Sequence, residues 1–114
     1  MSICITATED NLDCKVDERF GRCKYFILVD PVTKKFEAFE NPALSSPGGV
    51  GIKAANAILK YTPAAVITGL IGDNALNVLK AANTRVFTCR DRTVREAVEL
   101  YVDGKLEQVN APNN

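Results

Sequence analysis

The chain has 114 residues and no formal net charge, because 14 Lys and Arg residues balance 14 Asp and Glu residues. A hydrophobic fraction of 46% can supply the core of a single domain, and the balanced charge disfavours a nucleic-acid or membrane partner. The first residues carry neither a basic leader nor a long apolar helix, which predicts a cytoplasmic location.

Strand-like segments fill the first part of the chain. Residues 2–8 predict a first strand, and the apolar run Tyr-Phe-Ile-Leu-Val within residues 24–30 is typical of a buried strand. After a turn, residues 35–40 form a more polar edge strand, so the second and third strands make a hairpin. The polar connection 8–22 is long for a compact domain, and such loops are usually functional or mobile. Within it, we expect Phe20 to pack back onto the sheet.

The remainder alternates helix-period segments with short apolar runs. The pattern predicts a helix at 52–60, a strand at 64–68, a helix at 75–82, a strand at 84–88 and a helix at 94–102. Thr93 and Glu96 have the spacing of a capping box, and Asp73 is the expected N-cap of the middle helix. Residues 110–114 are polar and are expected to form a frayed tail.

This order of elements predicts one α/β domain over residues 1–109. A hairpin followed by crossover units favours a five-stranded mixed sheet, with strand two antiparallel to the rest and helices on both faces. Two glycine-rich turns, at residues 48–51 and 69–74, each open a helix. They bring free backbone amides and positive helix ends to one edge of the sheet, where we expect a binding site.

Several sequence blocks together resemble those of a known family. They are Val-Asp-Glu-Arg-Phe-Gly-Arg-Cys-Lys-Tyr-Phe at 16–26, Glu-Asn-Pro at 40–42, Gly-Gly-Val-Gly at 48–51, Ile-Thr-Gly-Leu-Ile-Gly-Asp-Asn-Ala at 67–75 and Tyr-Val-Asp-Gly-Lys-Leu at 101–106. In these blocks the chain resembles the dinitrogenase iron-molybdenum cofactor-binding domain family. The resemblance implies a three-layer, ribonuclease-H-like fold. It also implies a non-catalytic role as an accessory protein that carries an iron-, molybdenum- or mixed-metal sulfide cluster between a donor and an acceptor protein.

One position departs from the family pattern. Members close to nitrogenase tend to carry a histidine before the Phe-Gly pair, where this chain has Arg19, and the chain contains no histidine at all. A different cluster, such as the molybdenum-copper sulfide of the orange-protein branch, is therefore as compatible with the resemblance as the iron-molybdenum cofactor.

Metal-sulfide clusters are large soft anions, so a carrier needs backbone amides, cationic side chains and, in some sites, a thiolate. The expected cofactor-binding residues are Arg19, Arg22, Cys23, Gly48, Gly49, Gly51, Gly69, Gly72 and Asn74. Cys23 and Cys14 are the candidate metal ligands, with Cys23 expected in electropositive surroundings that favour the thiolate.

Each candidate also has a structural interpretation. The glycines can serve tight packing, and the two arginines can be solvated surface charges. None of the four cysteines forms a Cys-x-x-Cys pair, and reduced thiols are expected. Cys4 belongs to an apolar strand and is expected in the core, whereas the exposure of Cys14 and Cys23 is open and Cys89 is favoured as buried.

Other classes of function have less support in the sequence. A ribonuclease-H-type nuclease needs a carboxylate in the first strand, and residues 2–8 have none, so no catalytic residue is expected. A small-anion or nucleotide-binding sensor that uses the same glycine turns is the alternative function, although neither turn matches a phosphate-loop or dinucleotide motif. A partner-binding module without a ligand also stays open.

Overall fold

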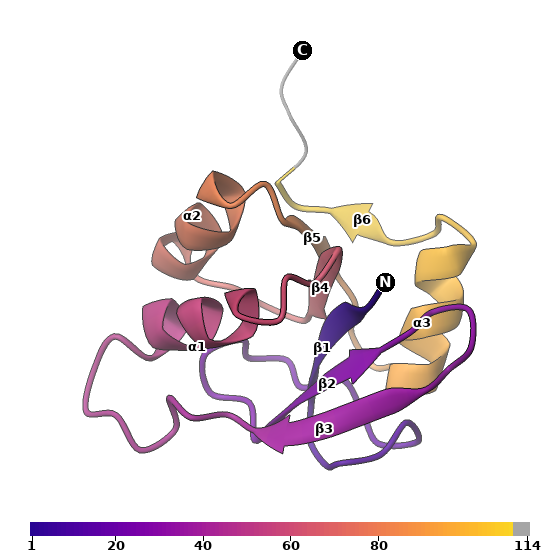
Figure 1. Ribbon diagram of the computed structural model, residues 1–114, viewed down its shortest axis with the longest axis horizontal. Coiled ribbons are helices and arrows are strands. Elements are labelled where there is room, and N and C mark those ends of the chain that lie inside the picture. The colour runs from indigo at the N-terminus through magenta and orange to yellow at the C-terminus, as the bar shows by residue number, and fades with distance from the viewer. Residues whose placement is uncertain (111–114) are drawn as a thin grey trace.

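The computed structural model describes residues 1–110 and shows an α/β fold. Its elements are β1 (Ile3–Ala7), β2 (Tyr25–Val29), β3 (Phe36–Glu40), α1 (Val50–Leu59), β4 (Ala65–Thr68), α2 (Asp73–Ala81), β5 (Arg85–Thr88), α3 (Val94–Val102) and β6 (Glu107–Gln108). The strands form one sheet in the order β3-β2-β1-β4-β5-β6 (Figure 1). Every predicted element is present, with ends that differ by at most two residues.

The sheet has six strands, so the prediction of five was wrong. β1 is central and pairs antiparallel with β2 and parallel with β4, as expected. The additional strand β6 pairs antiparallel with β5, through Phe87 with Gln108 and Thr88 with Glu107. A two-residue polar strand has no alternating apolar pattern, and its pairing depends on contacts with a strand about 20 residues earlier.

Asn110 was expected to begin a frayed tail but is anchored. Its side-chain oxygen accepts a hydrogen bond from the Val86 amide at 2.9 Å, and its side-chain nitrogen donates to the Thr84 carbonyl at 2.8 Å. The rest of the predicted tail, residues 111–114, lies outside the described residues.

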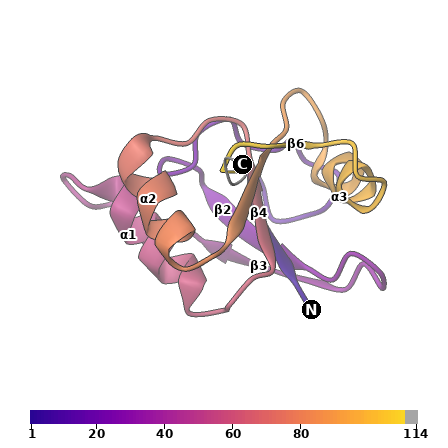
Figure 2. The same ribbon diagram turned by 90° about the horizontal axis from the view of Figure 1, so that it is seen from above.

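Helices cover both faces of the sheet, as predicted. Figure 2 shows α1 and α2 on one side and α3 on the other. On the α3 side, Val94 and Val98 join a core with Ile3 and Ile5. On the opposite side, buried residues of α1 and α2 pack against alternate residues of the same strands, among them Cys4. No helix within residues 1–110 combines the length and apolarity needed to cross a bilayer.

The long connection between β1 and β2 is tied down along its length. Isolated bridges pair Ala7 with Val16, Lys15 with Thr93 and Arg19 with Leu70. Phe20 is 2% exposed, and its ring lies 5.7 Å from that of Phe26, measured between centroids. The expectation that Phe20 packs onto the sheet is therefore confirmed, and the residues on either side of it are held in a fixed place.

Candidate functional site

A cleft of about 520 Å³ lies where three segments of the chain meet. Its walls are residues 19–22 of the β1–β2 connection, residues 49–52 at the start of α1, and residues 70–75 at the start of α2. The two glycine-rich turns and the arginine-bearing loop thus come together, although they are separated in sequence. This is the arrangement that the sequence pattern predicted for one edge of the sheet.

Both helices that open onto the cleft begin without a side-chain cap from the described residues. The N-cap of α1 is Gly49, whose φ of 67° is left-handed, and the N-cap of α2 is Gly72. In contrast, α3 begins with a complete capping box between Thr93 and Glu96, as predicted. The first amides of a helix have no acceptor within it, so residues 50–52 and 73–75 present free donors at the cleft. The positive ends of both helix dipoles add to this effect.

Asp73 does not have its expected place. Gly72 is the N-cap, with an extended backbone, and Asp73 is the first residue of α2. The acidic side chain therefore lines the cleft instead of capping the helix.

Two glycines allow the close approach of the cleft walls. A Cβ on Gly21 would lie 2.9 Å from the backbone nitrogen of Gly51, and a Cβ on Gly51 would lie 3.2 Å from that of Ala75. The packing interpretation thus holds for Gly51, which also lines the cleft.

Gly48 and Gly69 are outside the cleft, unlike the other predicted glycines. Gly69 has a structural role, because a Cβ there would lie 2.6 Å from the Cα of Glu18. That contact brings the end of β4 against the segment that carries Arg19. Gly48 precedes the α1 cap and has open space around it within the described structure.

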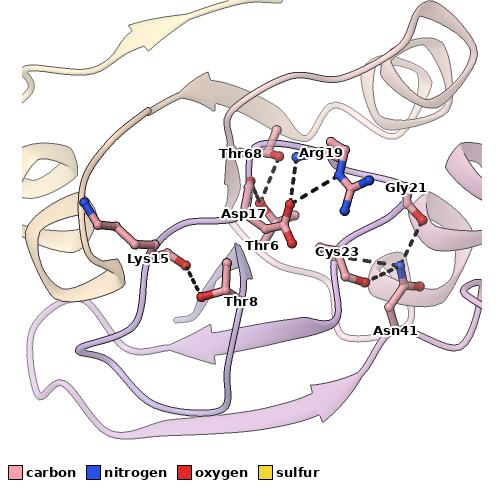
Figure 3. Close-up of polar contacts among 9 residues, drawn as sticks. All are labelled: Thr6, Thr8, Lys15, Asp17, Arg19, Gly21, Cys23, Asn41 and Thr68. Carbon is pink, nitrogen blue, oxygen red and sulfur yellow. Dashed lines mark hydrogen bonds and ion pairs between the residues drawn. The ribbon is translucent and has the colours of Figure 1, made fainter.

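The two arginines line the cleft and differ in their surroundings. Arg22 is exposed and forms no ion pair with any residue of the described part of the chain. The Nε atom of Arg19 lies 3.9 Å from Oδ1 of Asp17, which also accepts from the Arg19 amide at 3.0 Å (Figure 3). The Arg19 side chain is 68% exposed and its contact with Asp17 is long, so this ion pair contributes little stability and an anion in the cleft can compete for Arg19.

A small buried network fixes the segment before Arg19. The Thr6 hydroxyl donates to the Asp17 carbonyl at 2.8 Å and lies 2.9 Å from the Thr68 hydroxyl. Thr6 has one hydroxyl proton, so Thr68 is the donor between the two threonines. The Asp17 amide in turn donates to the Thr6 carbonyl at 2.8 Å. Figure 3 shows these contacts joining β1, β4 and the loop.

Asn41 fixes the loop on the other side of Arg22. Its side-chain amide donates to the carbonyl oxygens of Gly21 and Cys23, at 3.0 Å each (Figure 3). Its side-chain oxygen accepts from the Ala43 amide. Asn41 is buried, so these bonds are protected from competition with water. The Glu-Asn-Pro block of the sequence therefore has a positioning role that the sequence alone did not assign.

Cys23 is not the electropositive thiolate that the sequence predicted. Its side chain is completely buried and lies outside the cleft walls. Burial raises the pKa of the Cys23 thiol well above its ordinary value, and the nearby Asp17 carboxylate raises it further. A protonated, inaccessible thiol is a poor metal ligand.

The other cysteines also lie away from the cleft walls. Cys14 is half-buried, and its thiol donates to the Asn11 carbonyl at 3.0 Å. Cys4 is in the core, as expected, and burial raises the pKa of both Cys4 and Cys89. Among residues 1–110, no group of three or more His, Cys, Asp or Glu side chains could hold a metal ion. The cleft therefore offers hydrogen bonds and charge to an anion and no protein ligand of the thiolate type.

The apolar part of the cleft was not predicted from the sequence. Leu70 is 56% exposed and Ile52 is 39% exposed, and both line it. Phe20 and Ile71 contribute to the same walls. A signal was present, because Leu70 and Ile71 stand between two glycines in a turn, where polar residues are more usual.

Comparisons with known proteins agree with this architecture. The sequence profile of a family described as dinitrogenase iron-molybdenum cofactor matches residues 1–104. An uncharacterized protein of Methanocaldococcus jannaschii is 31% identical over 97 residues, which are 82% of each chain.

Two solved structures resemble the fold over nearly its whole length. The apo form of the orange protein from Desulfovibrio gigas has a TM-score of 0.91 at 35% identity, covering 99% of this chain and 96% of that chain. A putative NifB protein from Thermotoga has a TM-score of 0.82 at 28% identity, covering 99% and 97%. Because the family profile covers most of the sequence, the chain belongs to the dinitrogenase iron-molybdenum cofactor family.

Proposed function

We propose that the cleft binds an anionic metal-sulfide cluster as cargo, and that the protein is a non-catalytic accessory in metallocofactor assembly. The observation that carries this proposal is the convergence of two helix starts, both without side-chain caps, and two arginines on one cleft. Anions are favoured at helix N-termini by both the free amides and the dipole.

The donor set suits a cluster that already has its own sulfide ligands. Such a cluster needs no thiolate from the protein, and sulfide atoms at its surface accept hydrogen bonds from amide and guanidinium groups. The buried Cys23 thiol is then unnecessary for binding. Membership of the family and the likeness to the orange protein support a cluster of this kind.

Weak, reversible contacts are also what a carrier needs. Arg19 and Arg22 line the cleft and are exposed to solvent, and no protein–metal bond has to break before the cluster leaves. A donor protein can therefore load the cleft and an acceptor protein can unload it without any covalent step.

A binding experiment under anaerobic conditions tests this function. The protein is mixed with tetrathiomolybdate, desalted, and assayed by visible absorption and molybdenum content. Replacing Arg22→Gln removes one charge-assisted contact and is expected to weaken binding about tenfold.

The matched control is Arg90→Gln, which removes the same charge from an exposed arginine outside the cleft walls. We expect parent-like binding from this control. Equal losses in the two variants would show a general charge effect, and a parent that retains no molybdenum with or without copper or iron present would contradict cluster carriage.

A further inference from the structure

The walls of the cleft combine few charges with a large apolar surface. Leu70 and Ile52, here called its apolar rim, line the cleft and are 56% and 39% exposed. Water next to such surfaces is displaced favourably by any ligand that covers them. A ligand that fits this cleft therefore has to be wide enough to contact the apolar rim and the helix amides together.

The side chains that line the cleft carry a surplus of only one positive charge. Arg19 and Arg22 are positive, whereas Asp73 is negative. Arg19 also forms an ion pair with Asp17, in which Nε lies 3.9 Å from Oδ1. The small surplus of positive charge offers little compensation to an anion that must give up a tightly bound hydration shell. Compact oxyanions such as phosphate and molybdate hold their water in this way.

The size of the cleft also favours a larger anion over a compact oxyanion. A volume of about 520 Å³ has room for more than about ten water molecules at their share of liquid volume, ~30 Å³ each. A compact oxyanion at one helix start leaves most of that space filled with water. A sulfide-rich anion has a larger, more polarisable surface and spreads its charge over it, so it can contact the CH groups of Leu70 and Ile52.

We infer that the cleft selects its ligand by hydration: it takes large, weakly hydrated, sulfide-rich anions and rejects compact oxyanions, including the phosphate groups of nucleotides. Leu70 and Ile52 are the residues that determine this specificity. The inference rests on the proposed function and adds the class of anion that the site accepts.

Tetrathiomolybdate and molybdate make a suitable pair of probes. Both are tetrahedral dianions of the same metal, and they differ only in carrying sulfur or oxygen. Anaerobic calorimetry of the parent protein is expected to show a preference of about tenfold or more for tetrathiomolybdate. The variants Leu70→Ser and Ile52→Ser remove apolar surface from an exposed rim, and each is expected to reduce that preference about fivefold, with molybdate binding unchanged.

The control is Val102→Ser, at a residue of α3 that is 57% exposed and lies outside the cleft walls. We expect it to keep the parent preference, and circular dichroism establishes that all three variants are folded.

The outcomes separate this inference from the proposed function. A parent that binds both anions equally, or serine variants that keep the full preference, would overturn selection by hydration while anion carriage stands. A parent that binds molybdate or ATP more tightly would overturn it and identify an oxyanion sensor. Failure to bind either molybdenum anion would overturn the proposed function together with the inference.

Discussion

Replacing Gly72→Ser is expected to stabilise the protein and to weaken ligand binding at the same time. Gly72 is the N-cap of α2 and has φ −75° and ψ 159°, a conformation that serine adopts readily as an N-cap. An added Cβ meets no described atom within 4 Å. The new hydroxyl can therefore accept a hydrogen bond from the amide of Asn74 or Ala75, which is free in the parent.

Two contributions make up the expected gain in the free energy of unfolding. Serine is a better N-cap than glycine by a few tenths of a kcal/mol, and removing a glycine restricts the unfolded chain by about 0.4–1 kcal/mol. The sum is about 1 kcal/mol, which corresponds to a rise in Tm of roughly 3–6 °C for a domain of this size. Thermal and urea unfolding monitored by circular dichroism measure this gain.

The effect on binding has the opposite sign. One amide that is proposed to contact the cluster is now occupied by the serine hydroxyl, and a hydrogen bond to a charged group is worth about 1.5–3 kcal/mol. Tetrathiomolybdate binding should then weaken about tenfold. The control Gly48→Ser changes the unfolded chain equally but lies outside the cleft and caps no helix. A Gly72→Ser protein that is more stable yet binds like the parent would refute the role of the α2 amides.

Three further variants test other parts of the account. Phe20→Ala removes a buried ring from the cleft wall and should cost about 3–5 kcal/mol in urea unfolding and weaken binding; unchanged stability would contradict its place in the core. Cys23→Ser should lose about 1–3 kcal/mol, because it buries a hydroxyl, yet retain the cluster; loss of the cluster would return this thiol to the site. Hydrogen bonds from Thr93 hold the pKa of Glu96 below its ordinary value of 4.5. The stability that these bonds add is therefore fully present above pH 4.5, and it is lost as the pH falls through the lower pKa of the folded state. Glu96→Ala should therefore lose less stability than the parent between pH 7 and about pH 3, and equal losses by urea unfolding would contradict the capping box.

The sequence predicted the elements and the edge of the sheet where the cleft lies, because both follow from local patterns. Apolar runs, helix periods and glycine turns are properties of neighbouring residues. The α3 capping box was found for the same reason, since Thr93 and Glu96 are three residues apart.

What failed depended on contacts between distant residues. Cys23 follows a polar loop but is buried in the same cluster as Cys4 and Phe26, and its carbonyl accepts a hydrogen bond from Asn41, which is 18 residues away. β6 and the anchored Asn110 depend on pairing with β5. The apolar rim at Leu70 was overlooked because an exposed leucine in a turn gives no periodic signal.

The most direct test of the cleft is an anaerobic titration of isotopically labelled protein with tetrathiomolybdate, followed by amide nitrogen–proton NMR spectra. We predict that the largest shifts belong to the amides of residues 50–52 and 73–75, with smaller changes at Arg19 and Arg22. Shifts centred on Cys14 or Cys89, or a change spread evenly over the chain, would contradict it.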